Sequence, residues 1–220
     1  MRDAYHEALD SLSDDLVEMT RLVGSAMARA ATALLDADLA LAESVIAADE
    51  EVDRLQHALE ARAIEILARQ QPVATDLRLV VTTLRMSAEL ERMGDLARHI
   101  AKVARLRYPD SAVPAALRGT VLEMGQVAER IVVKTGSVIA GKDVRAALEL
   151  ERDDDEMDRL HRVLYSRLLD GTWTHGMEAA IDLTLVGRYF ERYADHAVTV
   201  ARRVVYLVTG SYLDATAVSS

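Results

Sequence analysis

The chain has 220 residues, of which half are hydrophobic and only 4% aromatic, with ten glycines, three prolines and no cysteine. Its formal net charge of −10 argues against a nucleic-acid partner, because the phosphate backbone is bound by a surplus of lysine and arginine. The lack of cysteine excludes a disulfide framework and a thiolate metal site and suits a reducing cytosol, while the wealth of alanine, leucine, valine, glutamate and arginine predicts long helices.

Apolar residues spaced three to four apart predict three long helices in the first half of the chain. Pro72 ends the second of them, because proline cannot donate the backbone hydrogen bond and disfavours helix in the residue before it. Asp76 is expected to cap the start of the third helix, and residues 108–114, which hold the other two prolines, form a linker. The three helices are predicted at about residues 5–36, 38–70 and 75–107.

The second half of the chain repeats the first half. At a shift of 105 residues Asp38 falls on Asp143, and Asp53-Arg54-Leu55 falls on Asp158-Arg159-Leu160; further along the chain the shift is 100. A fixed period of this kind indicates duplicated structural units. We therefore expect three further helices, at about residues 115–140, 144–170 and 176–210.

The predicted fold is all-α, with two tandem antiparallel three-helix bundles in residues 1–108 and 114–212 and a flexible tail at 213–220. The first residues lack the apolar segment of a signal peptide. No segment reaches the ~20 uncharged apolar residues that a membrane span needs. We therefore expect a cytoplasmic protein.

Each repeat carries two pairs of acids at four-residue spacing, which places the members of a pair about 5–6 Å apart on one helix face. The centres of the two pairs are equidistant from the predicted turn, at Pro72 in the first repeat and near residues 174–175 in the second. An antiparallel hairpin should therefore bring four carboxylates to one level in each half. The eight predicted metal ligands are Asp49, Asp53, Glu91, Asp95, Asp154, Asp158, Glu191 and Asp195, and Glu151, Asp153 and Asp155 are close alternatives to Asp154.

Four carboxylates without an obvious internal cation cannot all stay ionised at close range, so a compensating charge is expected. Oxygen ligands favour hard or borderline cations such as Mg²⁺, Mn²⁺, Ca²⁺ or iron. The alternative is a solvated face whose acids pair with neighbouring arginines, of which Arg54, Arg92, Arg159 and Arg192 are the candidates. The third helix favours the metal interpretation, because Glu91 and Asp95 continue its apolar stripe.

Two kinds of function remain open from the residues alone, a regulatory adaptor that docks other proteins and a multi-metal hydrolase or oxidase. The chain has no cysteine nucleophile, no Gly-x-Ser-x-Gly elbow and no glycine-rich phosphate loop, which favours the adaptor. His161 and His196 have no equivalent in the first repeat and are interpreted as surface or packing residues.

The four acid-x-x-x-Asp motifs and flanking segments such as Glu91-Arg92-Met93-Gly94-Asp95 resemble those of the PhoU family, called PhoY in some actinobacteria, over essentially the whole chain. The resemblance implies a cytoplasmic, non-enzymatic regulator of phosphate homeostasis. Such proteins restrain the high-affinity phosphate transporter, with its ATPase subunit, and help to hold a phosphate-sensing histidine kinase in its phosphatase state. The resemblance also implies iron, zinc or Mg/Mn at the motif carboxylates, a homodimer, and contact with membranes only through partners.

Overall fold

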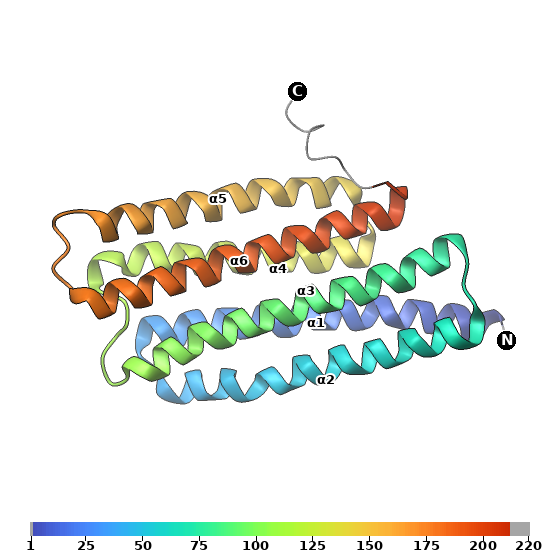
Figure 1. The fold of residues 1–220 in the computed structure, drawn as a ribbon, viewed down its shortest axis with the longest axis horizontal. Coiled ribbons are helices and arrows are strands. Elements are labelled where there is room, and N and C mark those ends of the chain that lie inside the picture. Colours follow the sequence, from blue (N-terminus) through green and yellow to red (C-terminus); the bar gives the residue numbers. More distant parts are fainter. Residues whose placement is uncertain (1, 212–220) are drawn as a thin grey trace, which may run out of the picture.

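The computed structural model describes residues 2–211, and within that range it consists of six long helices and one short 3₁₀ turn, with no strand (Figure 1). None of these helices combines the length and the apolar character that crossing a membrane requires. The predicted tail at 213–220 lies outside the described residues. In chain order the elements are α1 (Arg2–Asp36), α2 (Leu39–Gln70), α3 (Ala74–Arg107), η1 (Ala115–Leu117), α4 (Arg118–Gly141), α5 (Val144–Leu169) and α6 (Gly176–Thr209).

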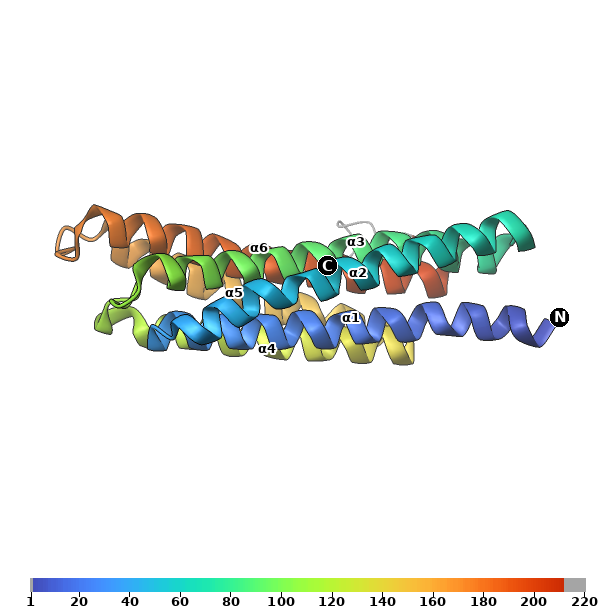
Figure 2. The same ribbon diagram turned by 90° about the horizontal axis from the view of Figure 1, so that it is seen from below.

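The helices form two antiparallel three-helix bundles that pack side by side, offset along the helix axis so that each projects beyond the other at one end (Figures 1 and 2). Helices α3 and α6 lie side by side in the middle, α1 and α4 lie side by side behind them, and α2 and α5 close the two outer edges (Figures 1 and 2). In the view of Figure 1, a half-turn in the plane of the picture exchanges the two repeats. The predicted fold class is therefore confirmed.

The turns that follow α1 and α4 are alike down to the residue that caps the next helix. Asp38 and Asp143, which align in the sequence, are the N-caps of α2 and α5, and each accepts a hydrogen bond from the amide three residues on, at 2.9 and 3.0 Å. Such a cap satisfies one of the unpaired amides of the first turn. The residues before them, Ala37 and Lys142, both have positive φ, at 52° and 49°.

The start of α3 agrees with the prediction within one residue, but its predicted cap is wrong, and α4 begins three residues later than predicted. Helix α3 begins at Ala74 with Val73 as its N-cap, so that Asp76 lies inside the first turn and caps nothing; its carboxylate instead accepts a hydrogen bond from the hydroxyl of Tyr5 at 2.9 Å. Helix α4 begins at Arg118, because the three residues before it form the 3₁₀ turn. In both cases the conformation of the preceding turn determines which residue begins the helix.

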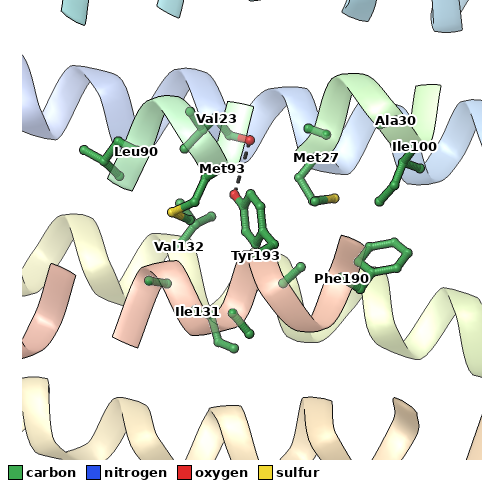
Figure 3. Close-up of a cluster of buried hydrophobic side chains, with 14 of the residues drawn as sticks. Val23, Met27, Ala30, Leu90, Met93, Ile100, Ile131, Val132, Phe190 and Tyr193 are labelled. Atoms are coloured by element: carbon green, nitrogen blue, oxygen red, sulfur yellow. Dashed lines mark hydrogen bonds between the residues drawn. The ribbon is translucent and has the colours of Figure 1, made fainter. Parts of the chain in front are cut away.

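One hydrophobic core runs through both halves, and Tyr193 of α6 lies at its centre (Figure 3). The ring is fully buried, and its hydroxyl donates a hydrogen bond to the backbone oxygen of Val23 in α1 at 3.2 Å. Tyr193 is also the middle residue of the acid motif between Glu191 and Asp195. The same turn of α6 thus supplies the core on one side and the acids on the other. Residues labelled around the ring include Val23, Met27, Leu90, Met93, Ile100, Ile131, Val132 and Phe190.

Small residues bring α1 and α4 close together in two equivalent contacts. A Cβ atom added at Gly136 would lie 2.7 Å from Oγ1 of Thr20, and one added at Gly125 would lie 3.2 Å from Cβ of Ala31. The repeat shift of 105 residues carries Thr20 onto Gly125 and Ala31 onto Gly136. The shift therefore maps each contact onto the other, which is what a pseudo-twofold axis between the halves requires.

Polar contacts between α3 and α6 join the two halves. Arg107 forms an ion pair with Asp182 at 2.5 Å, and Glu89 lies 2.7 Å from Nδ1 of His196 and 3.1 Å from Arg203. His196 is largely buried, as a packing residue is, but the sequence does not indicate that its ring nitrogen meets a carboxylate of the other half. Local sequence patterns do not predict this contact, because its partners are 107 residues apart.

Candidate functional site

The structure brings the predicted acids of each hairpin within electrostatic reach of one another, at the middle of the molecule. In the first half, burial raises the pKa of Glu91 most, and the charges of Asp95, Asp53 and Asp49 raise it further. In the second half, burial and then Asp195 raise the pKa of Glu191, with Asp158 adding to the effect. We name Asp49, Asp53, Glu91 and Asp95 the first acid cluster, and Asp154, Asp158, Glu191 and Asp195 the second acid cluster.

As their side chains are placed, the acids are spread along the helices rather than drawn to a point. Among the described residues, no three His, Asp or Glu side chains stand close enough together to hold one metal ion. The clusters are therefore regions of concentrated negative charge, and their chemistry depends on what offsets that charge. In this respect the two clusters differ.

The first acid cluster contains its own cation, Arg98 of α3. The Asp49 side chain is only 6% exposed, and one of its oxygens lies 2.5 Å from a guanidinium nitrogen of Arg98, while a second nitrogen of Arg98 contacts Asp95. Burial raises the pKa of Asp49, and the charge of Arg98 is the largest influence that opposes it. The guanidinium thus joins an acid of α2 to an acid of α3.

The arginines proposed from the sequence lie at the edge of the first cluster or outside it. Arg54 pairs with Glu51 on the outer face of α2. Arg92 is 65% exposed and stays 3.7 Å from both Glu91 and Asp95. The expectation that the four carboxylates lack an internal cation is wrong for this half. The missed residue carried a signal, since Arg98 follows Asp95 by three and shares its helix face.

A glycine lets α2 approach α3 at the first cluster. A Cβ atom at Gly94 would lie 3.3 Å from an oxygen of Asp49 and 3.4 Å from a methyl group of Val52, which is tighter than an ordinary contact. The corresponding residue of the second repeat is Ala194. The glycine therefore helps to hold Asp49 deep in the hairpin, where Arg98 reaches it.

Within residues 2–211, no ion pair reaches Asp154 in the second acid cluster. Oδ1 of Asp154 is buried and has no hydrogen-bond partner. The pKa of Asp154 is raised to about 7, first by burial and then by repulsion from Asp195, Asp158, Asp155 and Glu191. The residue equivalent to Arg98 is Val198, which is 4% exposed.

Neighbouring residues of the second cluster settle which acid of α5 belongs to it. Asp153 forms an ion pair with Lys134 of α4 at 2.8 Å, and Glu151 forms one with Arg202 of α6 at 2.8 Å. Asp155 is exposed. Asp154 is the acid of this group whose pKa is raised by the charges of Asp195 and Glu191 of α6. At the rim, half-exposed Arg188 contacts Glu191.

The two clusters fit a metal ion differently. The second acid cluster offers oxygen donors only, which is the donor set that hard divalent cations prefer. Oδ1 of Asp154 and Oδ2 of Asp49 are both buried without a hydrogen bond, so the clusters differ in the guanidinium that lies beside Asp49 and not in this respect. The first acid cluster does not fit a metal ion, because the guanidinium of Arg98 already occupies the space between Asp49 and Asp95.

The raised pKa of Asp154 predicts a specific dependence of stability on pH in metal-free buffer. An acid whose pKa is higher in the folded state adds stability that is fully present below its unfolded pKa, near 3.8, and is lost as the pH rises through about 7. Asp154→Asn should therefore be more stable than the wild-type chain at pH 8 by on the order of 1–2 kcal/mol, a value reduced for solvent screening. At pH 5, which lies between the two pKa values, the difference should be less than half as large, and it should disappear below the unfolded pKa.

Thermal melts at pH 5 and pH 8 with a chelator present measure this difference. A gain of roughly 2–6 °C is expected at pH 8 for a chain of this size. Asp14→Asn, the same change at an exposed site on α1, serves as the control and should show no such gain. An equal gap between wild type and Asp154→Asn at both pH values would contradict the prediction.

Comparison with known proteins adds an independent line of evidence. The family model described as PhoU domain matches the chain twice, at residues 16–104 and 121–204. The phosphate-specific transport system accessory protein PhoU homolog 2 of Mycobacterium tuberculosis is 48% identical over 212 residues, covering 96% of this chain and 100% of the relative. Homolog 1 of Mycobacterium leprae is also 48% identical, covering 96% of each protein.

Solved structures agree with this assignment of the fold. A crystal structure of the phosphate transport system regulatory protein PhoU from Streptococcus pneumoniae superposes with a TM-score of 0.86 at 23% identity, covering 96% of this chain and 99% of that one. A crystal structure of PhoU from Pseudomonas aeruginosa gives a TM-score of 0.83 at 27% identity, covering 94% of this chain and 100% of that one.

Proposed function

The chain belongs to the PhoU family, and on that premise we propose that it is an accessory protein of phosphate transport which regulates phosphate homeostasis through contacts with other proteins. In this proposal it restrains high-affinity phosphate uptake by contacting the ATPase subunit of the transporter. It also lowers the phosphate-starvation response by contacting the phosphate-sensing histidine kinase. The observation that carries the proposal is identity of 48% to named accessory proteins over 96% of the chain.

A role by contact is supported more than a role by turnover. The relatives that match along the whole chain are named accessory or regulatory proteins, not enzymes. The alternative of a multi-metal hydrolase or oxidase gains no support from them. The proposal therefore describes a cytoplasmic adaptor that acts as a homodimer and meets membranes only through its partners.

Metal binding enters the proposal at the second acid cluster. Asp154, Asp158, Glu191 and Asp195 would hold the ion, and the repulsion between Asp154 and the other three supports this choice. Iron, zinc and Mg/Mn remain the candidate ions. A bound ion would supply the positive charge that four carboxylates need. Its place between α5 and α6 would stiffen the hairpin that docks partners.

Two experiments together test the proposal: genetic complementation, and capture of partner proteins from cell extracts. In cells that lack the native protein, the wild-type chain should restore repression of phosphate-starvation genes at high phosphate. From phosphate-replete extracts it should capture the transporter ATPase and the sensor kinase. Glu191→Ala combined with Asp195→Ala should weaken both capture and repression at least severalfold, while the helical circular dichroism signal stays unchanged.

The control removes the same two charges elsewhere. Asp10 and Asp14 are exposed on α1 at the same four-residue spacing, and their double replacement by alanine should leave capture and repression intact. If neither partner is captured by the wild-type chain and repression is not restored, the proposed function is wrong. If the Glu191/Asp195 variant performs as well as the control, the second acid cluster is not part of the docking function.

A further inference from the structure

The two acid clusters occupy equivalent places in a duplicated fold, yet their central residues differ. Position 98 is arginine in the first repeat, and the equivalent position 198 is valine in the second. Both lie one turn beyond the last acid of their motif, on the helix that carries it. The first cluster therefore has a positive charge at this position, and the second cluster has none.

Arg98 is held where it forms a bridge between the two helices of its hairpin. One guanidinium nitrogen lies 2.5 Å from Asp49 of α2, and another contacts Asp95 of α3. The side chain of Arg98 is 29% exposed, so most of it is packed inside the hairpin. A planar guanidinium with several donors is well suited to join two carboxylates in this way.

A metal ion would need the carboxylate oxygens that Arg98 already contacts. To admit it, Arg98 would have to leave a buried aspartate, and the ion and the guanidinium would then repel each other. Breaking a buried charge pair by removing one partner is strongly unfavourable. At the second cluster the strongest influences on Asp154 are burial and other carboxylates. Arg188 contacts both oxygens of Glu191, but its side chain is half exposed and does not pair with a buried aspartate, so an ion at Asp154 would displace no buried guanidinium.

We propose that Arg98 is the resident cation of the first acid cluster, so that the first half of this chain takes no divalent metal ion and metal binding is confined to the second half. This inference rests on the proposed metal binding of the second acid cluster. The acids of the α2–α3 hairpin are then neutralised permanently by a side chain. The acids of the α5–α6 hairpin are neutralised only when an ion binds.

Mn²⁺ binding to the full-length chain tests the proposal. Bound Mn²⁺ per chain is measured by equilibrium dialysis and by the loss of the free Mn²⁺ signal in electron paramagnetic resonance. Binding to the wild-type chain should be abolished by Asp154→Asn with Asp158→Asn and unchanged by Asp49→Asn with Asp53→Asn. Arg98→Met, which keeps the apolar stem and removes the charge, should raise the bound Mn²⁺ toward twice the wild-type amount.

Arg92→Met is the matched control. Arg92 lies at the rim of the same cluster, so its replacement removes one positive charge without emptying the centre, and Mn²⁺ binding should not change. If Arg92→Met gains as much Mn²⁺ as Arg98→Met, general electrostatic attraction explains the gain and the proposal is wrong. Arg98→Gln serves as a second variant if the methionine variant loses its helical signal.

The remaining outcomes separate this inference from the proposed function. If each pair of asparagine substitutions removes about half of the bound Mn²⁺, both clusters bind metal and Arg98 is not the resident cation. If the wild-type chain binds no Mn²⁺, metal binding at the second acid cluster is wrong. The Arg98→Met variant still decides the role of Arg98 in that case: a gain of Mn²⁺ supports it, and no gain overturns it.

Discussion

Replacing Tyr193 by alanine is expected to lower the free energy of unfolding by about 3–5 kcal/mol, because the ring fills the centre of the shared core and its removal leaves a cavity. The side chain is fully buried among residues of α1, α3 and α4 (Figure 3). Urea unfolding followed by circular dichroism measures the loss. Because the core is continuous between the halves, both should unfold in one earlier transition.

Tyr193→Phe separates the ring from its hydroxyl. It keeps the packing and removes only the hydrogen bond to the backbone oxygen of Val23, so the loss should be about 1 kcal/mol. If the alanine variant is no less stable than the phenylalanine variant, the ring does not hold the halves together.

Replacing Arg107 by methionine is expected to lower the free energy of unfolding by about 1–3 kcal/mol, because it leaves the buried carboxylate of Asp182 without its partner. Asp182 is 5% exposed and accepts hydrogen bonds from two nitrogens of Arg107, at 2.5 and 3.2 Å. The pair fastens the end of α3 to the start of α6. Thermal or urea unfolding measures the effect.

Two further variants test the cause of this loss. Arg105→Met removes an exposed arginine two residues earlier on α3 and should change stability little. Adding Asp182→Leu to Arg107→Met removes the stranded charge and should recover much of the stability. A double variant as unstable as Arg107→Met alone would show that packing of the arginine stem, and not the unpaired carboxylate, causes the loss.

The sequence predicts the helices and the hairpins well because both depend on local rules. Apolar spacing defines a helix, Pro72 marks a turn, and equal distance from that turn brings acids on neighbouring helices to one level. The caps at Asp38 and Asp143 follow from the same local chemistry. Asp76 looked equivalent to them, but the conformation of the preceding turn made Val73 the cap instead.

The contacts that the sequence does not predict depend on how the helices pack against one another. Arg98 shares a face with Asp95, which is readable, but its contact with Asp49 requires knowing how deeply α2 sits against α3 beside Gly94. The contact of Glu89 with His196 joins the two halves and has no local pattern at all. Many arginines in the chain have acids three or four residues away, so spacing alone cannot single out the one that is held inside.

The pseudo-twofold axis has a consequence for how the molecule meets its surroundings. A half-turn about an axis perpendicular to the helix layer keeps each face of the molecule on its own side (Figure 1), so a stretch of helix and its repeat lie on the same face. A single polypeptide thereby presents two equivalent positions, as a dimer of a one-repeat protein would. The two positions are not interchangeable, since arginine stands at the centre of one and valine beside the other. The backbone of this face is symmetric while its chemistry is not, and a ligand that spans both positions is therefore given a single orientation.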